Sequence, residues 1–196
     1  QWVPAEKHYW NIEQAQVFIG EGLRLPGRYA PLFVLLTTTG LRISEALGLR
    51  WTDVDLKQRV IHVQRAAVLT ANQHSVLPTK TKAGNREVTL TASALAALSC
   101  LPRPIDSSEY VFRTSTGSIP KQTDLRRYLN RLTDLAGVPR INVHGLRHVA
   151  AMLALEATQD PYLVQRRLGH THVNTTLGIY GYPRRKEPIV AAAADD

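Results

Sequence analysis

Two arginines stand where a guanidinium could bind phosphate. Arg42 follows the turn Thr39-Gly40-Leu41 and precedes an acid, Glu45, by three residues. A guanidinium there can form a two-pronged hydrogen bond with a phosphate while the carboxylate orients it. Arg147 follows His144 by three residues, so at a helix start the two share one face and could hold two phosphate oxygens. The ordinary alternatives are a surface ion pair for Arg42 and a hydrogen-bonded structural role for His144.

A lysine and a tyrosine could transfer a proton and attack phosphorus. Lys82 lies at the tip of a predicted hairpin, where it could reach into a DNA groove or donate a proton if its pKa is lowered. Tyr180 follows His170 by ten residues, and a phenol attacks phosphorus well only where nearby cations stabilise the phenolate. Singly, a solvated lysine and a packed or surface tyrosine are the commoner roles. Together with the arginines, these residues form a complete set for one reaction, with cations for a pentavalent phosphate, a proton donor and a nucleophile.

Hydrophobic periodicity and capping residues predict the helices that would position these side chains. Asn11 and Thr91 are typical N-cap residues, and Gly40 breaks the chain between two apolar segments. In the helix expected over residues 123–136, Leu135 is among the apolar side chains expected to face inward. The expected helices cover residues 11–24, 29–37, a short stretch that begins near Ser44, 92–99, 123–136, 144–157, 160–168 and 172–180.

Residues 51–90 have a different composition. The segments Val60-Ile61-His62-Val63 and Val88-Thr89-Leu90 are rich in β-branched residues and partly alternating, which predicts a small antiparallel sheet. Residues 57–86 contain six basic side chains and no Asp or Glu. This is the most one-sided charge in the chain, and it lies around Lys82.

Composition sets limits on function. With 196 residues, of which 44% are hydrophobic and 20% charged, the chain has the composition of a globular protein with a real core. A formal net charge of +8 favours an anionic partner. Cys100 is the only cysteine, which excludes an intrachain disulfide and a thiolate zinc cluster. The sequence contains neither an apolar stretch of membrane-spanning length nor a signal segment, so we expect a cytoplasmic protein.

Four segments resemble the catalytic domain of the tyrosine recombinase (phage integrase) family: TGLRISEALGLRW, TKAGNREVTL, HGLRH and LGHTHVNTTLGIY. They match in residue type, order and spacing over most of the chain from Gly40 to Tyr180. The resemblance implies a mainly helical α+β fold, the catalytic-domain fold of tyrosine recombinases, with a small antiparallel three-stranded sheet. It further implies a DNA breaking and rejoining domain over residues 1–182 and a C-terminal tail over 183–196. Because the chain begins at Gln1, where that domain should begin, the family's N-terminal core-binding domain is expected to be absent from it.

The resemblance also implies a role for each candidate residue. Arg42 and Arg147 would clamp the scissile phosphate. Its non-bridging oxygens would accept hydrogen bonds from His144 and His170. Lys82 would protonate the departing 5′ oxygen, and Tyr180 would be the nucleophile that forms a 3′-phosphotyrosine link. Glu45 and His148 match positions that support these groups rather than react.

Two of these assignments have a neighbour that could replace them. Lys80 precedes Lys82 by two residues and would lie on the same face of a strand, so either could be the proton donor, although the Gly-Asn-Arg that follows favours Lys82. Tyr182 follows Tyr180 by two residues, and the Thr-Thr-x-x-x-Tyr spacing favours Tyr180.

The implied partner is double-stranded DNA, bound by a homo-oligomer, a tetramer formed through the full-length protein. Because the covalent link stores the bond energy, neither a cofactor nor a metal is implied. Three other functions remain open. A histidine-rich metal hydrolase could use His144, His148, His170 and His172, but no acid falls at a ligand-like spacing between these pairs to serve as the general base. A basic DNA-binding module without the reaction, and a topoisomerase-like or telomere-resolving relative, are the others.

Overall fold

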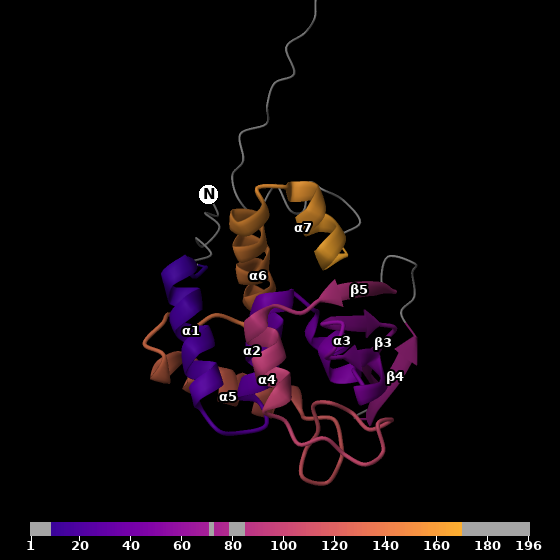
Figure 1. Cartoon of the computed structure of the whole chain (residues 1–196). Helices are drawn as coiled ribbons and strands as arrows, with labels where there is room; N and C mark the ends of the chain where they lie inside the picture. The colour runs from indigo at the N-terminus through magenta and orange to yellow at the C-terminus, as the bar shows by residue number, and fades with distance from the viewer. Residues whose placement is uncertain (1–8, 71–72, 79–84, 170–196) are drawn as a thin grey trace, which may run out of the picture.

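The computed structural model describes residues 9–70, 73–78 and 85–169 (Figure 1). Lys80, Lys82, His170, His172, Tyr180 and Tyr182, together with the helix expected at 172–180, lie outside the described residues. The helices are α1 (Ile12–Arg24), α2 (Ala30–Thr39), α3 (Ile43–Gly48), the 3-10 turn η1 (Trp51–Asp53), α4 (Ala92–Ser99), α5 (Gln122–Leu135), α6 (Val143–Thr158) and α7 (Pro161–Leu168). The strands are β1 (Val54–Asp55), β2 (Val60–Val63), β3 (Arg65–Thr70), β4 (Gln73–Pro78) and β5 (Arg86–Thr89).

Helix α2 forms the centre of the core. Its sequence, APLFVLLTTT, has no charged residue and no polar face apart from its threonines, so burial on all sides is favourable. It packs against α1, α4 and α6, which surround it in Figure 1. The buried hydroxyls of Thr37 and Thr39 donate hydrogen bonds to the carbonyls of Phe33 (2.8 Å) and Leu35 (2.6 Å) within the helix. The last turn of α2 is therefore fixed where the chain turns toward Arg42.

The predicted antiparallel sheet is confirmed, in the strand order β1-β2-β5. Ile61 pairs with Val88 across β2 and β5, and both are buried. The sequence did not separate a second element, the two-stranded antiparallel hairpin of β3 and β4, which packs against α3. Strand β5 begins at Arg86, so the first described strand residue after the segment that carries Lys80 and Lys82 is an arginine.

The ends of α2 and α7 meet at Gly40. Gly40 caps α2 with φ of 70°, in the left-handed region that favours glycine, and Gly169 caps α7 with φ of 65°. A Cβ atom on Gly40 would lie within contact of Leu168 and 3.3 Å from Cβ of Ala150. The absence of a side chain at Gly40 therefore brings the carbonyl ends of two helices together.

Two predicted helix caps are confirmed, whereas the predicted orientation of one apolar side chain is wrong. Asn11 accepts a hydrogen bond from the backbone of Gln14 (2.8 Å), and Thr91 from that of Ala94 (3.2 Å). The prediction that Leu135 faces inward is wrong, because 52% of this residue is exposed. It is the last residue of α5, where the neighbouring elements no longer cover the helix.

Replacing Gly40 by alanine should destabilise the fold. Left-handed backbone costs about 1 kcal/mol for alanine, and the contact with buried Leu168 adds overpacking, so a loss of about 2–4 kcal/mol in the free energy of unfolding is expected in urea. Gly137→Ala is the matched control, because Gly137 has φ of 66° and open space around its would-be Cβ. Equal losses for the two variants would show that the contact with Leu168 is unimportant.

Candidate active site

The site begins where α2 ends and α3 starts. Arg42 is the N-cap of α3, and the Glu45 carboxylate reaches back to accept the backbone N–H of Arg42 at 2.8 Å. The same carboxylate accepts a hydrogen bond from Nη1 of Arg42, also at 2.8 Å. The predicted orientation of Arg42 by Glu45 is thus observed. The alternative, an ion pair between the two residues, also forms, but it is not a surface pair, because only 3% of Glu45 is exposed.

A second arginine shares this carboxylate. Arg86, at the start of β5, donates from Nη1 and Nη2 to the two oxygens of Glu45, each at 3.0 Å. Each Glu45 oxygen therefore accepts two of the four hydrogen bonds described. Burial alone would raise the pKa of Glu45, but the hydrogen bonds and charge of Arg86, together with the hydrogen bonds of Arg42, outweigh it and lower this pKa. Glu45 is consequently ionised at neutral pH.

Arg147 is held by backbone carbonyls instead of acids. It lies in α6 with 5% of its surface exposed, and it donates to the carbonyls of Gly40 and Leu168, both at 2.6 Å. Carbonyls at helix C-termini have no partner inside their helix and carry partial negative charge, so they suit a cation. Burial, followed by the nearby charge of Arg42, lowers the pKa of Arg147 to about 10, which leaves it charged at neutral pH.

Arg42 and Arg147 meet at the end of α7. Nη2 of Arg42 donates to the carbonyl of Gly169 at 3.4 Å, and Arg147 binds the carbonyl of the preceding residue, Leu168. The next residue in the chain is His170. The side chain of Arg42 remains 46% exposed, so its guanidinium is accessible from solvent. Two of the predicted site residues, Arg42 and Arg147, are therefore brought together, and both contact the backbone just before a third, His170.

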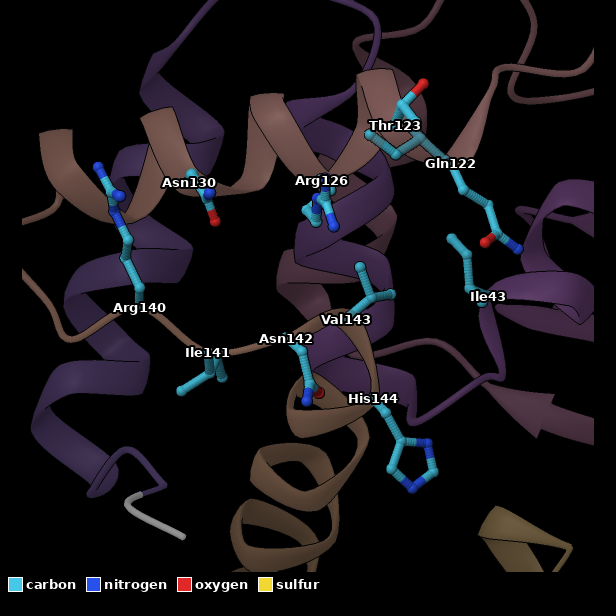
Figure 2. A pocket seen from close by; sticks show the side chains of 11 residues that line it. Ile43, Gln122, Thr123, Arg126, Asn130, Arg140, Ile141, Asn142, Val143 and His144 are labelled. Carbon is cyan, nitrogen blue, oxygen red and sulfur yellow. The ribbon is translucent and has the colours of Figure 1, made fainter. Parts of the chain in front are cut away.

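His144 lies in the first turn of α6, one turn before Arg147, beside a cavity of about 630 Å³. Its ring is perpendicular to that of His148, with 5.0 Å between the centroids, and the ring of Tyr9 lies 4.6 Å from that of His148. Figure 2 shows Arg126 and Asn130 pointing from α5 toward the segment that leads into α6. The cavity is lined by Ile43, Gln122, Thr123, Leu125, Arg126, Asn130, Arg140, Ile141, Asn142, Val143 and His144.

Two arginines at this site were not singled out from the sequence. Arg86 counted only as one of the basic residues in the acid-free stretch. Arg167 donates to the carbonyls of Thr38 (3.1 Å) and Thr89 (3.4 Å), and burial lowers its pKa. The acid-free stretch was the available signal for Arg86. It could not name Glu45 as the partner, because 41 residues separate the two.

Metal ligands and membrane helices are not found in the described part of the chain. No group of three or more His, Cys, Asp or Glu side chains there could hold a metal ion. His170 and His172, which the metal hypothesis also needs, lie outside that part. None of the described helices is long and apolar enough to cross a membrane.

Comparison with known proteins identifies the family. The model of the Phage integrase family matches residues 19–186, and the chain belongs to this family. A tyrosine recombinase XerC-like protein of Caldanaerobacter subterraneus is 28% identical, with 86% of this chain and 49% of the relative covered. The ICEBs1 integrase of Bacillus subtilis is 24% identical, with 92% and 52% covered. The chain thus spans about half the length of these relatives.

Solved structures confirm the mainly helical α+β fold. The Tn1549 transposon integrase in complex with circular intermediate DNA superposes with a TM-score of 0.75 at 23% identity, covering 90% of this chain and 64% of that one. The XerA recombinase gives a TM-score of 0.70 at 24% identity, covering 91% and 60%. The predicted catalytic-domain fold is therefore correct.

Replacing Glu45 by glutamine should destabilise the fold at neutral pH. The change leaves Arg86 buried without its counter-charge, and breaking such a pair costs about 3 kcal/mol of unfolding free energy. Because the pKa of Glu45 lies below its ordinary value of 4.5 in the folded chain, ionised Glu45 stabilises the fold above that pH and the contribution is lost as the pH falls further. As the pH falls below 4.5, the free energy of unfolding should therefore decrease less in the variant than in the wild type.

Urea unfolding from pH 3 to pH 7 would measure both effects. The control is Asp134→Asn, which removes the same charge from an exposed pair with Arg140, where the side chains are 51% and 60% exposed. This control should have little effect at neutral pH, because exposed pairs are screened by water. An Asp134→Asn loss as large as that of Glu45→Gln would contradict the central place given to Glu45.

Proposed function

We propose that this chain is the catalytic domain of a site-specific DNA recombinase, or integrase, in which Tyr180 cleaves and rejoins DNA strands. The observation that carries the proposal is the meeting of Arg42 and Arg147 at the carbonyls of Leu168 and Gly169, immediately before His170. Membership of the Phage integrase family supports it independently.

The charge of the cluster suits attack on a phosphodiester. The cluster of Arg42, Arg86, Arg147 and Glu45 carries three positive charges and one negative charge, which leaves two, apart from the further charge of Arg167. A phosphodiester carries one negative charge, and a second develops on its non-bridging oxygens as the nucleophile adds. Fixed cations that face this developing charge lower the barrier, since they need no reorganisation at the moment of reaction. The exposed guanidinium of Arg42 is available for the first contact with the phosphate. The three N–H groups that Arg147 does not use on the two backbone carbonyls are proposed to make the second.

The proposed reaction conserves the number of phosphoester bonds. The phenol of Tyr180 loses its proton to solvent and its oxygen bonds to phosphorus, the bond to the 5′ oxygen breaks, and Lys82 gives that oxygen its proton. Arg42 and Arg147 clamp the phosphate, while His144 and His170 donate hydrogen bonds to its non-bridging oxygens. A 5′-hydroxyl of the partner strand then gives its proton back to Lys82 and attacks the 3′-phosphotyrosine, and the released phenolate takes up a proton from solvent. No net energy is required, so the proposed reaction needs no ATP. The arginines supply the positive charge that a metal ion would otherwise provide, so the proposal includes no metal.

The proposed substrate is double-stranded DNA. The net charge of +8 favours a polyanion, and the cavity beside His144 has two arginines, Arg126 and Arg140, among hydrogen-bonding side chains. The Tn1549 integrase, which shares this fold, is described in complex with DNA. The place of action would be the DNA of a bacterial or phage-infected cell, in its cytoplasm.

The proposed organisation is a catalytic domain over residues 1–182 followed by a tail over 183–196. Exchange between two duplexes requires the cleavage of four strands, and each cleavage uses one tyrosine. A tetramer of the full-length protein on DNA would supply four. The tail is proposed to dock on a neighbouring protomer during assembly.

Covalent capture tests this function. The chain, supplied as full-length protein if needed, is incubated in the presence of EDTA with a library of nicked duplexes of randomised sequence. The nick lets the cleaved end diffuse away, so rejoining fails and the adduct accumulates. We expect a protein–DNA band that survives denaturant for the wild type and disappears for Tyr180→Phe.

Tyr182→Phe is the matched control and should retain the band. Loss of the band in Tyr182→Phe but not in Tyr180→Phe would move the nucleophile to Tyr182. DNA binding without any covalent band would favour the binding-module alternative. A band that forms only without EDTA would contradict the metal-independent reaction.

A further inference from the structure

Arg86 uses all three of its guanidinium nitrogens inside the protein. Its side chain is 9% exposed, Nη1 and Nη2 bind the two oxygens of Glu45, and Nε donates to the carbonyl of Arg167 at 3.1 Å. Three of its five N–H donors are used in this way, and because 9% of the side chain is exposed, little of the guanidinium is accessible to a phosphate. The parallel pair of hydrogen bonds to the carboxylate is the strongest geometry available to an arginine.

These contacts join three segments of the candidate site. Arg86 begins β5, directly after the stretch that contains Lys82, while Glu45 lies in α3 with Arg42. The third contact, the carbonyl of Arg167, lies near the end of α7, three residues before His170. Figure 1 shows β5 between α7 and α3. The hydrogen bonds of Arg86 to the carbonyl of Arg167 and to Glu45 connect these two helices.

Arg42 and Arg86 contribute unequal numbers of guanidinium hydrogen bonds to Glu45. Arg42 gives the carboxylate one guanidinium nitrogen and remains 46% exposed, whereas Arg86 gives it two and is buried. Because the charge of Arg86 compensates that of Glu45, the charge of Arg42 is not neutralised inside the protein. Without Arg86, Glu45 would have Arg42 as its one side-chain cation among the contacts described, and the cluster would lose one of its two net positive charges.

We propose that Arg86 is a positioning residue for the cleavage reaction, which holds Glu45 so that Arg42 presents a free charge to the scissile phosphate. The inference rests on the proposed function and adds a residue to it. Arg86 itself does not contact the substrate. It acts through Glu45 and Arg42, and it fixes the end of α7 in the same place.

The test compares two scissile linkages in the duplex that the wild type captures. One linkage is the natural phosphodiester, and the other is a methylphosphonate, in which a methyl group replaces one non-bridging oxygen and removes the negative charge. Single-turnover cleavage is measured in the complete protein for the wild type, Arg86→Met, Arg86→Lys and Arg42→Gln. Methionine fills similar space without donors, and lysine keeps the charge but cannot form the two-pronged contact.

Arg86→Met should slow cleavage of the phosphodiester by about 100-fold, the scale of one lost transition-state contact. It should slow cleavage of the methylphosphonate by less than about 10-fold, because that linkage has less charge to stabilise. Arg42→Gln should show the same preference, and Arg42→Gln combined with Arg86→Met should be little slower than Arg42→Gln alone, since one residue acts through the other. Arg86→Lys should recover only part of the rate.

The matched control for stability is Arg65→Met. Arg65 binds the buried carboxylate of Asp53 at 2.5 Å, an arginine–carboxylate pair outside the site. It should lower stability without changing the ratio of the two cleavage rates. The role of Arg86 would be overturned if Arg86→Met slowed cleavage of both linkages equally, or if it cleaved at the wild-type rate. The proposed function would still stand in that case, provided that the wild type forms the Tyr180 adduct. Absence of that adduct in the wild type would overturn both.

Discussion

Two guanidiniums share the buried carboxylate of Glu45, and the positions of the surrounding cations depend on that contact. A buried carboxylate is costly unless its oxygens are paired, and here each oxygen accepts two hydrogen bonds from Arg42 and Arg86. The same pairing overcomes the effect of burial on the pKa of Glu45. One acid thus fixes an exposed cation and a buried one, which come from segments far apart in the sequence.

Arg147, which is buried, and Arg167, which is half-buried, are held by backbone carbonyls, which stabilise a charge without cancelling it. Arg147 binds the ends of α2 and α7, and Arg167 binds Thr38 and Thr89. Gly40 makes this arrangement possible, because it allows the two helix ends to approach. A cluster built in this way remains cationic, and a chain of the Phage integrase family that acts on DNA phosphates would need such a charge. Arg42, as the exposed member, connects the cluster to solvent.

Local signals in the sequence predicted the local parts of the structure. The caps at Asn11 and Thr91 and the contact between Arg42 and Glu45 depend on residues three apart, so spacing was enough to find them. The partners of Arg86 and Arg147 could not be found in this way. Arg86 lies 41 residues from Glu45, and Arg147 lies 107 residues from Gly40, so these contacts exist only after the helices and strands have packed. The prediction for Leu135 was wrong for a related reason. Periodicity indicates which face of a helix is apolar, but it does not indicate where the neighbouring elements stop covering that face.

The most direct measurement identifies the residue that carries the DNA. The covalent adduct is digested with nuclease and trypsin, and the peptide that bears a nucleotide is sequenced by mass spectrometry. The account predicts a nucleotide linked through its 3′-phosphate to Tyr180, together with a free 5′-hydroxyl on the released strand. A nucleotide on another residue, or a link through a 5′-phosphate, would contradict a cluster arranged to support attack by Tyr180.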